Sequence, residues 1–190
     1  MQLTQTVIEE FRLMEVSAQN PNEIFDVVDE NDCVIGQATR AEVHRKKLFH
    51  RAVHILVFDA DGNVILQKRS LAKDTAPGLL STSCAGHVDA GETYDSAAFR
   101  ELGEELGIPP REAKNLKFLF AMSPQEQLGW EFIRVYALRY AGTLVPDPTE
   151  IEGLTALPPE KIDREIRERP PAFAESFKLV WEQFRIRAKV

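Results

Sequence analysis

Residues 86–108 read GHVDAGETYDSAAFRELGEELGI, and they carry more information than any other part of the chain. Glu101, Glu104 and Glu105 are spaced so that, on a helix, their carboxylates stack on one face. Like charges this close repel each other and weaken an isolated helix. A hard divalent cation reverses that penalty, because Mg²⁺ and Mn²⁺ prefer oxygen ligands. The run therefore indicates either a metal-binding helix face or an ordinary solvated acidic surface.

The residues around the acidic run favour metal binding. Thr93 is a good N-cap, and Gly107 followed by two prolines ends the helix. Between these caps lie apolar residues that can face a core, namely Ala97, Ala98, Leu102 and Leu106. Gly86 and Gly91 flank a short loop whose backbone can face a ligand. Arg100 can reach back to Glu92 or pair with Glu104, which would orient the carboxylates.

The segment resembles the Nudix box, whose pattern is G-x5-E-x7-R-E-U-x-E-E-x-G-U with U an aliphatic residue. Every specified position is matched, by Gly86, Glu92, Arg100, Glu101, Leu102, Glu104, Glu105, Gly107 and Ile108. The resemblance implies an α/β fold, an α/β/α sandwich with a mixed sheet. It also implies a pyrophosphohydrolase that uses Mg²⁺ or Mn²⁺ to cleave a nucleoside-diphosphate-type substrate by attack of water at phosphorus.

The resemblance further assigns roles to residues. The metal ligands would be Glu101, Glu104 and Glu105, with the Gly86 carbonyl as an extra ligand, and Arg100 and Glu92 would complete the catalytic set. One carboxylate should act as the general base. The candidates are Glu101 and two glutamates of the acidic segment 146–152, Glu150 and Glu152; a solvated acidic loop is the alternative for that segment.

A second likeness covers roughly residues 23–185. His50, Arg69, Lys73, Pro77-Gly78, Gly86-His87 and Glu131 follow the register of isopentenyl-diphosphate isomerases, a branch of the same superfamily. In that branch the basic pair, here Arg69 and Lys73, grips the substrate diphosphate. A metal binds at the positions of His50, His87 and Glu131. His44 lies near another metal-ligand position of that branch, but one residue out of register with it. From the residues alone, Arg69 and Lys73 are better explained as a solvated strand end.

Three departures weaken the isomerase hypothesis. Ala85 replaces the cysteine that precedes Gly-His in the isomerases, and Cys84 is one position too early, which in a strand points it to the opposite face. Gly129 replaces an acidic ligand, and the Nudix box is intact. The leading hypothesis is therefore an isomerase-like Nudix hydrolase, ahead of an isomerase or a non-catalytic nucleotide-binding sensor. Without the cysteine, we favour a loop hydrogen bond for His87.

Composition bounds the remaining possibilities. The chain has 190 residues, 44% of them hydrophobic, and a net charge of −7, which suits one domain over 21–190 and a small-molecule diphosphate substrate but no nucleic-acid polymer. Neither cysteine has metal-ligand spacing, and no apolar run suits a secretory signal or a membrane helix. We expect a cytoplasmic protein.

Hydrophobic periodicity gives the element order. An amphipathic helix at residues 3–17, within an extension spanning 1–20, would pack on its own domain or form a homodimer. Strands are expected at 23–30, 33–36, 52–58, 64–67, 117–122 and 131–140, and helices at 39–46, 93–106, 158–167 and 172–187. Trp130, at a strand start, is the best candidate to stack a substrate base.

Overall fold

The computed structural model describes residues 19–188, so the helix expected at 3–17 lies outside the described residues. The described chain begins with a hairpin of β1 (Ile24–Val28) and β2 (Val34–Thr39), followed by α2 (Arg40–Lys46). Thr39 caps α2, because its hydroxyl accepts a hydrogen bond from the Glu42 N–H at 3.3 Å. Both predicted strands and the helix are confirmed.

A mixed seven-stranded sheet forms the centre of the molecule. Its strands are β3 (His50–Phe58), β4 (Val64–Arg69), β5 (Leu80–Ser81), β6 (Cys84–His87), β7 (Lys117–Met122), β8 (Glu131–Arg139) and β9 (Ile151–Leu157). The main path runs β5-β4-β3-β8-β7, with β6 paired to β3 and β9 paired to β4. Only β3 and β8 are parallel, so the predicted mixed sheet is confirmed.

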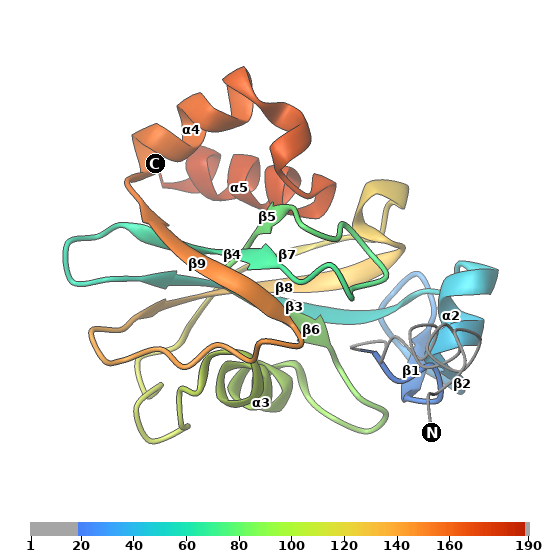
Figure 1. The fold of residues 1–190 in the computed structure, drawn as a ribbon. Coiled ribbons are helices and arrows are strands. Elements are labelled where there is room, and N and C mark those ends of the chain that lie inside the picture. The colour runs from blue at the N-terminus through green and yellow to red at the C-terminus, as the bar shows by residue number, and fades with distance from the viewer. Residues whose placement is uncertain (1–18, 189–190) are drawn as a thin grey trace, which may run out of the picture.

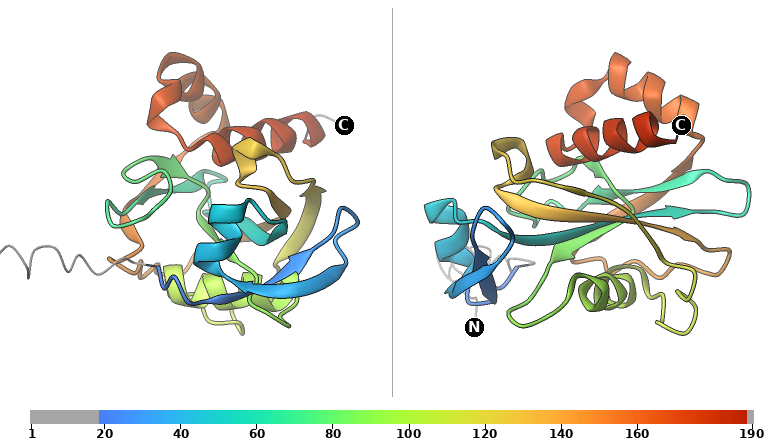
Figure 2. Two further views of the ribbon diagram at one scale, coloured as in Figure 1. Left: turned by 90° about the vertical axis from the view of Figure 1, so that its right-hand side faces the viewer. Right: turned by 180° about the vertical axis from the view of Figure 1, so that it is seen from behind.

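Helices cover both faces of this sheet (Figures 1 and 2). One face is covered by α3 (Tyr94–Leu106), and the other by α4 (Pro159–Glu168) and α5 (Glu175–Arg187). Two short 3₁₀ turns, Glu126–Leu128 and Pro170–Ala172, complete the elements. The α/β/α sandwich is therefore confirmed. Within residues 19–188, no helix combines the length and apolar character needed to cross a membrane.

Each face has its own core. Leu102 and Leu106 of α3 pack with Val53 and Ile55 on one side. On the other side Phe177 and Trp181 of α5 pack with β3 and β4 residues such as Leu66. Each of these side chains is buried, which stabilises the fold by about 1.5–3 kcal/mol per large side chain. Apolar packing on both faces of the sheet fixes the position of α3 relative to the polar ends of the strands.

Local sequence explains the ends of α3. Thr93 and Ser96 form a reciprocal capping box at its start. Gly107 ends it with φ +68°, a left-handed conformation that glycine adopts readily. Both caps are as predicted, and they fix which face of the helix carries the glutamates.

Three strand assignments were wrong or missing. Gly86 lies inside β6 rather than at the edge of a loop, and β5 and β9 were not predicted. These strands are short or rich in small and polar residues, and they form because β3 and β4 offer them hydrogen-bonding edges. Glu152 therefore belongs to β9, while Glu150 stays in the preceding turn.

Gly103 inside α3 and Gly107 at its C-terminal cap allow a matched test of this account. Gly107→Ala should lower the free energy of unfolding by about 1–2 kcal/mol, because an L-residue is strained there. A Cβ would also lie 3.0 Å from the Cβ of Val145. Gly103→Ala, inside the helix with no neighbouring atom closer than 3.8 Å, should raise it by about 0.5–1 kcal/mol. Urea unfolding measures both; shifts of the same sign would contradict the assigned helix end.

Candidate active site

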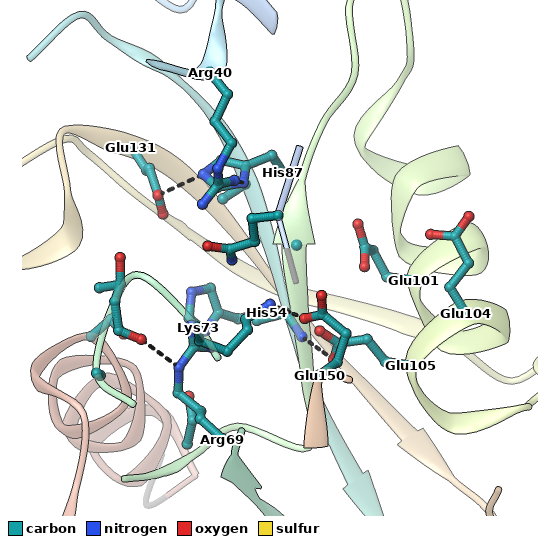
Figure 3. A pocket seen from close by; sticks show the side chains of 18 of the residues that line it. Arg40, His54, Arg69, Lys73, His87, Glu101, Glu104, Glu105, Glu131 and Glu150 are labelled. Carbon is teal, nitrogen blue, oxygen red and sulfur yellow. Dashed lines mark hydrogen bonds and ion pairs between the residues drawn. The ribbon is translucent and has the colours of Figure 1, made fainter. Parts of the chain in front are cut away.

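A polar cavity of about 480 Å³ lies where the strand ends meet α3. Its walls come from α2, β3, β6 and α3, together with the loop after β4, the turn before β9 and the start of α5. Figure 3 shows its two sides: Glu101, Glu104 and Glu105 project from α3 on one side, and Arg40, Arg69 and His87 lie across from them.

The acidic wall is held by the backbone of β6. Glu105 is buried and accepts hydrogen bonds from the Gln67 amide at 3.1 Å and the Ala85 N–H at 3.2 Å. Glu101 is also buried, and its carboxylate occupies the space where a side chain at Gly86 would be. A Cβ on Gly86 would lie only 2.0 Å from that carboxylate, so any other residue at this position would displace the end of the Glu101 side chain. Glu104 is exposed at the mouth of the cavity.

Arg100 links the glutamates to one another. Its guanidinium donates to Glu92, to Glu101 at 2.7 Å and to Glu104 at 3.0 Å. It also donates to the backbone carbonyl of His87 at 2.9 Å. Both contacts considered from the sequence, to Glu92 and to Glu104, are present together. Arg100 thus ties α3 to the loop after β6 and fixes the direction of the carboxylates.

The acidic wall fits a divalent cation. Burial, followed by the charge of Glu105, raises the pKa of Glu101 to about 8. Burial also raises the pKa of Glu105, against the opposing charge of Lys73. Two buried carboxyl groups this close resist being ionised at the same time. A hard divalent cation would stabilise both in the ionised form by binding their oxygen atoms. The residues that would hold Mg²⁺ or Mn²⁺ are Glu101, Glu104 and Glu105, with the adjacent Gly86 carbonyl.

The opposite wall is basic. Lys73 is buried and pairs with Glu150, and burial lowers the pKa of its ammonium group. Arg69 is half-buried, and its Nε donates to the Thr75 carbonyl at 2.8 Å. The preference for a solvated strand end was therefore wrong for these two residues. Both line the cavity, where they can bind phosphate oxygens.

Sequence reasoning missed Arg40. This first residue of α2 is 5% exposed, lines the cavity and places Nη1 3.0 Å from Nδ1 of His87. Its nearest carboxylates, Glu23 and Asp74, are 3.9 and 3.8 Å away, beyond hydrogen-bond distance. No local motif marks it, because the hairpin and α2 reach the cavity only through the tertiary fold. Arg40 adds a third cation to the basic wall.

The remaining candidates divide according to whether they reach the cavity. Glu150 lines it, whereas Glu152 lies on β9 and pairs with Lys68 at 2.7 Å. Trp130 does not line it. The left-handed turn at Gly129 and Trp130, with φ of +70° and +67°, turns the indole toward Phe49, 6.1 Å away between ring centroids. The expectation that Trp130 stacks a substrate base finds no support in this geometry.

The isomerase-type positions also come together. Glu131 Oε1 lies 3.2 Å from Nε2 of His87 and 3.5 Å from Nε2 of His50. His44 joins them, since ligand atoms of the three histidines lie within 4.8 Å of one another. Burial lowers the pKa of His87 to about 4. Although burial raises the pKa of Glu131, the hydrogen bond from His87 and the nearby ring of His50 hold it well below its usual value. The loop role favoured for His87 was wrong, because His87 lies in β6 and contacts Glu131 and Arg40.

Comparison with known proteins matches this geometry. A NUDIX domain family model matches residues 48–178. The chain belongs to the Nudix family. It is 35% identical over 147 residues to an uncharacterized Nudix hydrolase of Streptomyces coelicolor, covering 77% of this chain and 81% of that one. It is 40% identical over 120 residues to isopentenyl-diphosphate Delta-isomerase 2 of Photorhabdus laumondii, covering 63% and 68%.

The fold has a matching crystal structure. DR0079 from Deinococcus radiodurans superimposes with a TM-score of 0.75 at 28% identity, covering 85% of this chain and 98% of that one. The family and its hydrolase members identify this Nudix protein as a pyrophosphohydrolase, an enzyme that cleaves diphosphate linkages in small molecules. Nudix hydrolases generally use divalent metal ions, which agrees with the acidic wall.

The contact between Gly86 and Glu101 can be tested directly. Gly86→Ala should weaken Mn²⁺ binding by about 10- to 100-fold if Glu101 is a ligand, because the new methyl group displaces its carboxylate. Gly36→Ala, where a Cβ meets no atom within 4 Å, is the matched control and should bind Mn²⁺ as the native chain does. Isothermal calorimetry gives both affinities. Equal affinities would show that Glu101 does not depend on the β6 backbone.

The raised pKa of Glu101 predicts a pH-dependent stability. A carboxyl whose folded pKa exceeds its unfolded value of 4.5 stabilises the fold fully below that value and loses this contribution as pH rises toward 8. In EDTA, the melting temperature of the native chain should therefore fall between pH 6 and pH 8 relative to that of Glu101→Gln. Added Mg²⁺ should remove the difference. A constant difference across this range would rule out the protonated carboxyl.

Proposed function

We propose that this protein is a Mg²⁺-dependent hydrolase of nucleoside-diphosphate-type substrates, in which water attacks phosphorus. The supporting observation is the cavity in which the carboxylates of α3 face Arg69 and Lys73. A bound divalent ion would polarise phosphoryl oxygens, lower the pKa of water and neutralise charge on the leaving phosphate. Mn²⁺ suits the same oxygen ligands.

The basic wall would hold the substrate. Arg69 and Lys73 would bind diphosphate oxygens, Arg69 with its bidentate fork. Arg40 faces the same space, and its ion-pair partners Glu23 and Asp74 lie beyond hydrogen-bond distance, so it would bind a further phosphate oxygen. Arg100 and Glu92 would act through the box glutamates, because Arg100 contacts Glu101 and Glu104 directly.

Two carboxylates are candidates for the general base. Glu101 is buried beside Gly86, and Glu150 lines the cavity in an ion pair with Lys73. We favour Glu150, since Glu101 is already held by Arg100 and is needed as a metal ligand. A diphosphate bound at Lys73 would release Glu150 toward water in the cavity. Glu152 is set aside, because it faces Lys68 rather than the cavity.

The choice between the two acidic-segment glutamates gives a matched pair of variants. Glu150→Gln should lower kcat by about 10²-fold or more, because general-base catalysis contributes about 10²–10⁴-fold. Glu152→Gln should stay within about twofold of the native rate. Phosphate and pyrophosphate release would be measured over nucleoside di- and triphosphates, nucleotide sugars, dinucleotides and isoprenoid diphosphates. Equal rates in both variants would remove Glu150 as the base.

The same panel tests the proposal as a whole. Glu105→Gln should abolish turnover while the cavity remains folded, because Glu105 is a buried member of the metal-binding set. Reaction in H₂¹⁸O should place the label on the phosphorus that is attacked. No turnover of any panel substrate with Mg²⁺ or Mn²⁺ would count against the hydrolase. Metal titration with no binding would instead revive a non-catalytic nucleotide sensor.

One observation favours a second candidate, an isoprenoid diphosphate isomerase. His44, His50, His87 and Glu131 gather at one end of the cavity, and isomerases occur among the relatives. The proton-transferring cysteine is absent, however. Ala85 occupies its place, and Cys84 is fully buried in the core with its pKa raised by burial. Isopentenyl diphosphate incubated in D₂O should therefore take up no deuterium; uptake would establish isomerisation.

A further inference from the structure

His54 lines the cavity but has no part in the function proposed above. It lies on β3 directly opposite Ala85 of β6, close to the acidic wall, and is 5% exposed. It belongs neither to the box nor to the histidine and glutamate cluster around Glu131. Its place in the cavity makes it available to a bound substrate (Figure 3).

Hydrogen bonding fixes the form of the His54 ring. Nδ1 lies 3.1 Å from the Thr82 hydroxyl, and that hydroxyl donates its single proton to the Cys84 carbonyl at 3.3 Å. The Thr82 oxygen therefore accepts from His54, so Nδ1 carries the ring proton and Nε2 carries a lone pair. Burial lowers the pKa of His54 to about 4, which leaves the ring uncharged at neutral pH.

Nε2 opens on the cavity. It has no hydrogen-bond partner within the part of the chain that the structure describes. It is also not among the fully enclosed polar atoms that lack a partner, such as Gln67 Oε1. A lone pair at this position repels phosphate oxygens, which the cations Arg69 and Lys73 attract instead. The group that meets Nε2 must donate a hydrogen bond.

The rest of the cavity suits a hydroxylated group rather than a stacked base. Hydroxyl side chains line it at Thr75, Ser81, Thr149 and Ser176. Among residues 19–188, no Phe, Tyr or Trp side chain lines it, so the only aromatic rings that the described walls offer a nucleobase are the imidazoles of His44, His54 and His87. Hydrogen bonding to hydroxyls is the recognition that these walls can supply.

We propose that His54 accepts a hydrogen bond from a hydroxyl of the group attached to the diphosphate, and that the cavity thereby selects a sugar-like, hydroxyl-bearing moiety with little regard to the base. This inference rests on the proposed function and narrows its substrate class. His54 is a specificity-determining residue, because a site built to bind a hydroxyl rejects an analogue that lacks it.

The test measures binding as well as turnover. The probes are α,β-methylene ADP, its 2′-deoxy and 3′-deoxy counterparts, and α,β-methylene UDP, titrated by calorimetry with Mg²⁺. For the native chain, loss of the recognised hydroxyl should weaken binding at least tenfold, and exchange of the base should change it less than threefold. Turnover of the parent nucleotides should follow the same order.

Two matched variants isolate Nε2. His54→Asn keeps an N–H that can donate to Thr82 but places no acceptor at the position of Nε2, so its preference for the hydroxyl should fall to within twofold. His54→Gln returns an amide oxygen near the position of Nε2, and the preference should partly recover. Both variants should keep the native melting temperature within a few degrees and the native Mn²⁺ affinity, which separates substrate recognition from folding and metal binding.

The outcomes distinguish the two proposals. An unchanged hydroxyl preference in His54→Asn, no such preference in the native chain, or a base effect larger than the hydroxyl effect would overturn the role of His54 and leave the hydrolase intact. Faster turnover of isoprenoid diphosphates, which carry no hydroxyl beyond the diphosphate, would do the same. No diphosphate hydrolysis with any panel substrate would overturn the proposed function, and this inference with it.

Discussion

The close approach of β6 to α3 is the constraint on which the site depends. A glycine at position 86 lets the Glu101 carboxylate enter space that any side chain would fill. The neighbouring Ala85 N–H holds Glu105, and Arg100 ties the helix back to the carbonyl of His87. Apolar packing of Leu102 and Leu106 beneath the sheet keeps this contact in place. The acidic face is thus fixed by backbone as much as by side chains.

The parts of this site that the sequence predicts are those formed by residues close together in the chain. Thr93, Gly107 and the spacing of the glutamates are local signals, so the ends and acidic face of α3 were predicted correctly. The strand β6 and the residue Arg40 depend on contacts with β3 and His87, which are distant in sequence, and neither was found. Trp130 shows the converse, since a left-handed turn directs it away from the cavity despite its position beside a strand.

Buried acidic and basic side chains face each other across the cavity. The carboxylates of Glu101 and Glu105 and the ammonium group of Lys73 are all buried, and burial shifts the pKa of each toward its neutral form. A cation bound at the carboxylates and an anion bound at the basic wall would stabilise the charged forms of these groups. The uncharged imidazole of His54 lines the same cavity. Charged groups would thus bind the diphosphate and the metal, and His54 would form a hydrogen bond with another part of the ligand.

The ion pair between Lys73 and Glu150 has a consequence for inhibition. A ligand that places an anion on Lys73 competes with the Glu150 carboxylate for the ammonium group, so part of its binding energy is used to weaken a buried contact. A compound that is neutral at this end leaves the pair closed and gains nothing from the lysine. A compound that carries its own cation there could instead retain Glu150 as a partner. The cavity would therefore accept two kinds of inhibitor: one that separates Lys73 from Glu150, and one that leaves this ion pair intact.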